Sequence, residues 1–151
     1  MIMRIPSKFP QFEDENVLLV ATGAQDTDIY IASNGVMDKV VSFRIPRRRY
    51  SDKEGFSVQK SGVSGSAREY PKEAAIKEFL NRLENELKAV SKKQKISYVC
   101  LFSPDYMRKM VESVFPAVLR NKIKISVAGN FPKLSPVLLL KKINLKRKKT
   151  I

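Results

Sequence analysis

The sequence contains no histidine, no tryptophan and a single cysteine. Histidine is the most common general base in enzymes and a frequent zinc ligand, so its absence removes a usual member of an active site. One cysteine can form neither a disulfide framework nor a thiolate metal site. Because Cys100 lies within the apolar run of residues 98–102, we expect a buried core residue in a protein from a reducing compartment.

Long hydrophobic runs are also absent. No stretch approaches the roughly 20 apolar residues that span a membrane, and the N-terminal segment lacks the apolar region of a signal peptide. The sequence has no Walker phosphate loop and no paired nucleotide fingerprint, so we expect no cofactor. The 151 residues, of which 43% are hydrophobic, are enough for one sizeable core. These features predict a soluble, cytoplasmic protein with one domain.

Acidic residues are scarce in the last third of the chain. The formal net charge is +14 and the isoelectric point is about 10.0. Residues 1–45 contribute −2, residues 46–68 contribute +4, residues 69–95 contribute +2 and residues 96–151 contribute +10. This charge exceeds what solubility needs and favours a polyanionic partner such as RNA, DNA or an anionic membrane.

Three short runs rich in β-branched residues predict the first half of the fold. They cover residues 16–23, 26–33 and 36–45. The first is apolar on both faces, as expected of a central strand that is covered on both sides. The second and third are separated by Asn34-Gly35, which is a strong signal for a two-residue hairpin turn. The pattern predicts a three-stranded antiparallel meander.

A long helix is predicted after a connection over residues 46–68. Apolar residues recur there at the spacing of one helical face. They are Ile76, Phe79, Leu80, Leu83, Leu87 and Val90. Pro71 fits the first turn of a helix, where the backbone amides have no partner within the helix. The helix should therefore begin near residue 69.

The second half of the chain alternates strands and helices. Residues 96–102 and 122–129 are predicted to be strands, since the first is a continuous apolar run and the second alternates lysine with isoleucine. Ser103-Pro104 and Ser135-Pro136 each place an N-cap serine before a proline at the first helical position, which predicts the starts of two helices. The second of these should end at about Ile143.

The predicted order is β-β-β-α-β-α-β-α, which is typical of an α/β, ribonuclease H-like mixed sheet. An active nuclease of that fold needs several carboxylates that bind two metal ions, normally with one on the first strand. Residues 17–22 and 96–102 contain no Asp or Glu. We expect Asp26, Asp28 and Asp38, on or near the meander, to be solvated surface residues. The sequence therefore predicts neither nuclease activity nor a metal site.

Several segments resemble the bacterial host attachment protein family. They are the helix EYPKEAAIKEFLNRLENEL, the passage YVCLFSPDYMRKMV and the segment LRNKIKISVAGNFPKLSPVLLLKKI. That family is related to the middle domain of archaeal and eukaryotic class-one peptide-chain release factors and of the ribosome-rescue protein pelota. The resemblance predicts such a domain over residues 16–143, between an N-terminal extension of residues 1–15 and a basic tail of residues 144–151.

The resemblance also suggests a role for the connection that follows the third strand. In the release factors, a loop in this position contains a Gly-Gly-Gln motif that enters the ribosomal peptidyl-transferase centre. The comparable run here is GVSGSAR, residues 62–68, in which Gly65 is followed directly by Ser66 and the glutamine is absent. Hydrolysis of peptidyl-tRNA is therefore not expected. We expect a long, positively charged loop whose serine hydroxyls and backbone amides bind phosphates.

Three sets of residues are candidates for nucleic-acid binding. The first combines consecutive arginines with a tyrosine, the second lies in the Gly/Ser run, and the third is the basic tail. They are Arg47, Arg48, Arg49 and Tyr50; Lys60, Ser64, Ser66 and Arg68; and Lys146, Arg147, Lys148 and Lys149. A solvated basic turn, a disordered connection and a solubilising tail would explain the same sets without a ligand, and both interpretations stay open.

The prediction for function is a non-enzymatic domain that binds RNA or the ribosome. The alternative is a protein-interaction or surface-attachment factor whose basic segments bind acidic proteins or anionic membranes. A degenerate enzyme would need convergent polar groups, which the sequence does not reveal.

Overall fold

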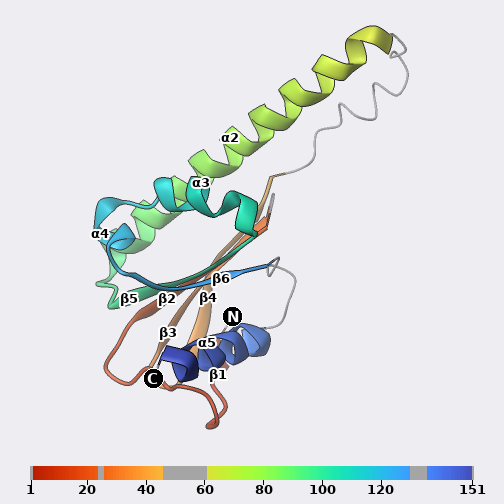
Figure 1. Cartoon of the computed structure of the whole chain (residues 1–151). Coiled ribbons are helices and arrows are strands. Elements are labelled where there is room, and N and C mark those ends of the chain that lie inside the picture. Colours follow the sequence, from red (N-terminus) through yellow and green to blue (C-terminus); the bar gives the residue numbers. More distant parts are fainter. Residues whose placement is uncertain (1, 24–25, 46–60, 130–135, 151) are drawn as a thin grey trace.

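The computed structural model describes residues 2–23, 26–45, 61–129 and 136–150, with the backbone alone in 61–73 and 147–150. The strands are β1 (Ile2–Arg4), β2 (Val17–Thr22), β3 (Asp26–Ser33), β4 (Val36–Arg44), β5 (Tyr98–Ser103) and β6 (Ile123–Ala128). The helices are α2 (Ser61–Lys93), the 3-10 turn η2 (Asp105–Met107), α3 (Arg108–Ser113), α4 (Ala117–Arg120) and α5 (Pro136–Thr150). Figure 1 shows helices on both faces of the sheet.

The six strands form one mixed sheet in the order β1-β4-β3-β2-β5-β6. β3 pairs antiparallel with both β2 and β4, which confirms the three-stranded meander. β5 pairs in parallel with both β2 and β6. β5 and β6 therefore extend the meander beyond β2. This arrangement confirms the prediction of an α/β fold and is consistent with the ribonuclease H-like class.

Asn34 and Gly35 form the turn between β3 and β4. Their φ angles are 45° and 79°, and a type I′ hairpin needs positive values at both central residues. A Cβ atom on Gly35 would lie 2.9 Å from Oε1 of Gln11, so the turn also lies close to the N-terminal segment. The predicted hairpin is therefore confirmed, and it fixes the register between the two strands.

The sheet has a hydrophobic core on each face because side chains alternate along its strands. Along β2, Leu18 and Val20 belong to one core cluster, whereas Val17, Leu19 and Ala21 belong to the other. All five side chains are fully buried. β2 is therefore a central strand covered on both sides, as its apolar sequence predicts.

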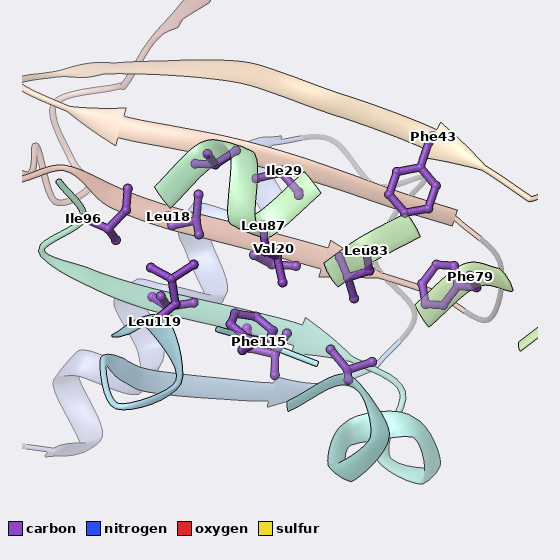
Figure 2. Close-up of a cluster of buried hydrophobic side chains, with 14 of the residues drawn as sticks. Leu18, Val20, Ile29, Phe43, Phe79, Leu83, Leu87, Ile96, Phe115 and Leu119 are labelled. Atoms are coloured by element: carbon purple, nitrogen blue, oxygen red, sulfur yellow. The ribbon is translucent and has the colours of Figure 1, made fainter. Parts of the chain in front are cut away.

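α2 covers one face of the sheet with its apolar stripe. Phe79, Leu83 and Leu87 are fully buried on the same face as Leu18 and Ile29, as Figure 2 shows. Full burial of each such side chain contributes about 1.5–3 kcal/mol to stability. The predicted periodicity thus identifies the residues that attach this helix to the sheet.

α5 and the N-terminal segment cover the opposite face. Ile5, Phe9 and Phe12 are buried in the same cluster as the apolar residues of α5. β1 pairs antiparallel with β4 at the edge of the sheet. The N-terminal segment therefore packs into the same core as the central strands.

The start of α2 differs from the prediction. The helix begins at Ser61 rather than near residue 69, so residues 61–68 are helical and are not part of a loop. Pro71 lies inside the helix instead of in its first turn, and it removes one backbone hydrogen bond there. Figure 1 shows the first half of α2 extending away from the sheet.

Cooperativity explains this extension of α2. A helix that is already fixed by its packed half gains further residues without a new nucleation step. Ala67, Arg68 and Glu69 are favourable or neutral in a helix, and they partly offset about 1 kcal/mol for each of the two glycines and about 3 kcal/mol for Pro71. The Gly/Ser composition of this run was therefore insufficient evidence for a loop.

The start of the helical layer after β5 also differs from the prediction. Ser103 is the last residue of β5, and η2 begins after Pro104 with no side-chain hydrogen bond to cap it. The predicted N-cap at Ser103 is wrong, because the chain leaves the strand through a 3-10 turn before α3 begins at Arg108. Ser135 lies outside the described residues, but α5 begins at Pro136 as predicted.

α5 continues to Thr150 instead of ending at about Ile143. Residues 144–150 contain no glycine or proline, and leucine, lysine and arginine are good helix formers. Lysine and arginine near the C-terminal end of a helix are also stabilised by its dipole. The basic residues at 146–149 therefore belong to a helix and not to an extended tail.

Candidate nucleic-acid interface

α5 packs on the sheet through one apolar side. Leu139, Leu140 and Ile143 are fully buried in the cluster that includes side chains of β2 and β5. Lys141 and Lys142 lie between the buried positions and are exposed. Burial of the three apolar residues fixes the rotation of the helix about its axis, so the lysines are presented to solvent in a defined direction.

β6 contacts α5 and adds another exposed lysine. The Nζ atom of Lys124 lies 5.0 Å from the centre of the Tyr98 ring, a cation–π contact that restricts the side chain at the surface. Lys122 is half-buried, and its Nζ donates a hydrogen bond of 2.7 Å to the carbonyl oxygen of Ile96. Lys124 therefore adds to the charge beside α5, whereas the ammonium of Lys122 is bound at the start of β5.

We call the exposed Lys124, Lys141, Lys142 and Lys146 the basic surface. No Asp or Glu follows Glu112 in the sequence, so neither α5 nor β6 contains an acidic residue. Surfaces of one sign attract oppositely charged polymers and increase their local concentration. The four exposed lysines are therefore candidates for contacts with phosphates.

α2 has a different charge pattern. On this helix Arg82 lies 3.0 Å from Glu86, and Lys88 lies 3.4 Å from Glu84, measured between the charged atoms. Exposed pairs of this kind contribute about 0.3–0.5 kcal/mol to a helix. They also offset the positive charge locally, so the packed half of α2 is not a comparable site for a polyanion.

The predicted binding residues of the first set, Arg47, Arg48, Arg49 and Tyr50, lie outside the described residues, as does Lys60. Ser64, Ser66 and Arg68 lie within α2, so the expected phosphate-binding loop is helical at these positions. From Ser64 onward, the backbone amides bond to carbonyl groups of the helix itself, and they are not offered to phosphate. The proposed role of this run as a flexible loop is therefore wrong for residues 61–68.

The third predicted set lies within α5. Lys146 is exposed, and Arg147, Lys148 and Lys149 continue the helix toward Thr150. The candidate set drawn from the sequence omits Lys124, Lys141 and Lys142. Two patterns could have identified them: the alternation of lysine with isoleucine in residues 122–125, and the helical period after Pro136.

Two of the carboxylates considered for catalysis have cationic partners. Asp28 accepts a hydrogen bond of 2.7 Å from the Ser42 hydroxyl and lies 3.7 Å from Nζ of Lys39. Asp26 lies 3.7 Å from Nε of Arg44. Both are partly buried rather than fully solvated. Among the described residues, no group of three or more His, Cys, Asp or Glu side chains is placed to bind a metal ion.

Tyr30 lies in the same region of the sheet as Asp28. Burial of its ring, and to a smaller extent the negative charge of Asp28, raise the pKa of Tyr30 to about 12. Nζ of Lys39 lies 5.7 Å from the ring centre. Tyr30 is thus neutral at physiological pH, and its ring packs in the core.

A cavity of about 580 Å³ opens at the amino ends of β2 and β5. The carboxyl ends of β5 and β6, which precede α3 and α5 in the chain, lie at the opposite edge of the sheet. Its lining consists of Asp14, Glu15, Asn16, Ser33, Asn34, Lys95, Ile96, Ser97 and Lys122. The lining combines the carboxylates of Asp14 and Glu15 with the ammonium groups of Lys95 and Lys122, so its charge is mixed. The cavity therefore does not extend the basic surface.

Comparison with solved structures identifies a similar architecture. The archaeal translation termination factor aRF1 matches this chain with a TM-score of 0.51 and 7% sequence identity, over 89% of this chain and 39% of that chain. The fold is similar to part of a release factor. This chain thus spans less than half the length of that protein, and at such low identity the likeness concerns the fold alone.

No family model matches the chain, and no curated protein matches it in sequence. Within the described ranges, none of the helices has the length and apolar character needed to span a bilayer.

Proposed function

We propose that this chain is a non-enzymatic domain that binds RNA, on the ribosome or free, through α5 and β6. The observation that carries the proposal is the placement of α5. Three fully buried apolar residues hold it on the sheet, while Lys141 and Lys142 face solvent on a helix that has no acidic residue. Because phosphate contacts supply most of the sequence-independent affinity for nucleic acids, this arrangement favours RNA binding.

The fold supports a link to translation. aRF1, whose structure is similar, is a translation termination factor. We extend this link to the present chain because its basic helix lies on a sheet of the same architecture. The resemblance to the host attachment protein family stays a prediction, and it is compatible with the same fold.

We further propose that the domain does not hydrolyse peptidyl-tRNA. The run that resembles the Gly-Gly-Gln loop lacks the glutamine, since Gly65 is followed by Ser66. It also lies within a helix and not in an extended loop. Binding without hydrolysis is therefore the activity that we assign.

The salt dependence of RNA binding tests the proposal. For a single strand, each phosphate neutralised steepens the dependence by about 0.7 log units of affinity per log unit of salt. The double substitution Lys141→Gln with Lys142→Gln should therefore lower the slope by about 1.4, measured by fluorescence anisotropy of a labelled single-stranded RNA. The double substitution Lys77→Gln with Lys92→Gln on α2 is the control, because it removes the same charge from exposed positions elsewhere.

The control variant should keep the slope of the wild type. An affinity that is independent of salt for the wild-type protein would contradict RNA binding through phosphates. Equal reductions by the two variants would show that only net charge matters and would contradict a site on α5.

A second candidate function follows from two other residues of α5. Leu138 and Leu145 are 37% and 56% exposed beside the lysines, and a basic helix with exposed leucines suits an anionic bilayer surface. Co-sedimentation with phosphatidylserine vesicles, but not with phosphatidylcholine vesicles, would favour this surface-attachment function. The substitution Leu145→Ser should then weaken vesicle binding without affecting RNA.

A further inference from the structure

The carboxyl ends of β5 and β6 form a topological switch point. After β5 the chain continues into η2 and α3, whose buried residues Met107 and Val111 belong to the cluster on the α2 side. After β6 the next described helix is α5, whose buried residues belong to the opposite cluster. In open α/β sheets, ligands bind in the crevice outside the carboxyl ends of strands at such a point.

Tyr106 lies at this edge of the sheet, in η2. Its side chain is 73% exposed, the highest value among the exposed large hydrophobic side chains of the described residues. The backbone beneath it is fixed, because Met107 is only 1% exposed and its N–H donates a hydrogen bond of 3.0 Å to the carbonyl oxygen of Pro104. An aromatic ring on a fixed backbone loses little conformational entropy when a base stacks on it.

Charged residues flank Tyr106 in the sequence. Lys109 is exposed and Arg108 is half-buried at the start of α3, whereas the exposed Asp105 disfavours a phosphate directly beside Tyr106. At the end of β5, the fully buried Ser103 hydroxyl has no hydrogen-bond partner among the described residues. This combination favours a base at the ring, with its phosphates displaced toward the cations.

The position of the ring relative to α5 defines a path for a ligand. β5 and β6 are neighbouring parallel strands, and Gly129 at the end of β6 donates a backbone hydrogen bond of 2.9 Å to Ser103 at the end of β5. α5 is the next described helix after this end of β6. A strand of RNA that follows the basic surface toward the start of α5 therefore approaches the edge where Tyr106 lies.

We propose that Tyr106 stacks on an unpaired base of a single-stranded RNA whose phosphates contact Lys109 and the basic surface. This inference rests on the proposed function, and it adds the class of RNA that the domain prefers. A duplex keeps its bases stacked within the helix, so it offers no base to the ring. Single-stranded RNA should therefore bind more tightly than a duplex of the same sequence.

The substitution Tyr106→Trp provides a direct reporter, because the natural sequence contains no tryptophan. A stacked base should quench the fluorescence of the introduced tryptophan when a 12-nucleotide single-stranded RNA is added at low salt. The matched control is Val118→Trp, since Val118 is also exposed, at 56%, but lies on α4. The control should bind the same RNA without quenching.

Affinities of two further variants complete the test. Tyr106→Phe should bind single-stranded RNA like the wild type, whereas Tyr106→Ala should lose about fivefold or more in affinity. Binding of the duplex should be the same for all three proteins. Because the side chain is exposed, neither change should disturb folding.

The outcomes separate this inference from the function on which it rests. If the wild type binds RNA, but Tyr106→Ala binds single strands equally well or the introduced tryptophan is not quenched, the stacking role is overturned and RNA binding stands. Quenching by the duplex to the same extent would overturn the preference for single strands. If the wild type binds no RNA at all, the proposed function and this inference fail together.

Discussion

Backbone strain is concentrated at the hairpin turn. In the described residues, positive φ angles outside glycine occur at Phe12, Asp14 and Asn34, all next to this turn. The backbone N–H groups of Asn34 and Gly35 donate hydrogen bonds of 2.9 and 2.7 Å to the carbonyl oxygens of Phe12 and Gln11. These bonds offset part of the strain and hold the N-terminal segment on the meander.

The substitution Gly35→Ala should destabilise the fold by more than about 1 kcal/mol, because alanine disfavours the positive φ angle and its Cβ would lie 2.9 Å from Gln11 Oε1. Urea unfolding at neutral pH measures the change. The control Val36→Thr alters an exposed residue of the adjacent strand and should change stability by less than about 0.5 kcal/mol. Equal stability of the wild type and Gly35→Ala would contradict the positive φ angle at Gly35 and its close approach to Gln11.

Tyr30 makes stability dependent on pH at the alkaline end. Its pKa is raised from about 10 to about 12 by folding, so between these values the unfolded chain has lost the phenolic proton while the folded chain retains it. Stability must therefore fall as the pH rises from about 10 to about 12. Urea midpoints at pH 9 and pH 11.5 should differ less for Tyr30→Phe than for the wild type. An identical pH dependence of stability in the two proteins would contradict the raised pKa of Tyr30.

Individual elements show how far the sequence could predict the fold. The meander, the apolar stripe of α2 and the start of α5 were predictable, since alternation, a 3.6-residue period and a proline signal are local patterns. The first half of α2 was not predictable from the sequence. Its helical state depends on propagation from the packed half and not on the local composition of residues 61–68. The N-cap at Ser103 failed because a serine before a proline can also end a strand.

Some residues of the candidate site could be predicted from the sequence, and others could not. Charge density identified the C-terminal basic residues from composition alone. Lys124 was missed because its relevance depends on β6 lying beside α5, which is a tertiary contact. Similarly, the exposed ring of Tyr106 is apparent only once η2 buries the neighbouring Met107.

The substitution Gly65→Ala tests the corrected start of α2. If residues 61–68 are helical, alanine should raise helical content by favouring the helix by about 1 kcal/mol at that position. Far-UV circular dichroism and backbone chemical shifts of residues 61–68 measure this change. Gly65→Pro is the opposite control and should lower helicity in the same segment. Random-coil shifts in all three proteins would show that this part of α2 is absent.

Positive charge is distributed unevenly over the molecule. Carboxylates and lysines together line the cavity at the amino ends of β2 and β5, whereas α5 and β6, which carry the basic surface, contain no acidic residue. The sheet between them is rigid because its central strand is buried on both sides. Under the proposed function, this uneven distribution directs a polyanion to α5 and β6.

Sedimentation with ribosomes on a sucrose gradient tests the central claim most directly. The wild-type protein should migrate with ribosomal particles at low salt and return to the top fractions at high salt, since its contacts are with phosphates. The reversal Lys141→Glu with Lys142→Glu should remain at the top at both salt concentrations, while the reversal Lys77→Glu with Lys92→Glu on α2 should still co-sediment. Wild-type protein at the top of the gradient under every condition would contradict the account.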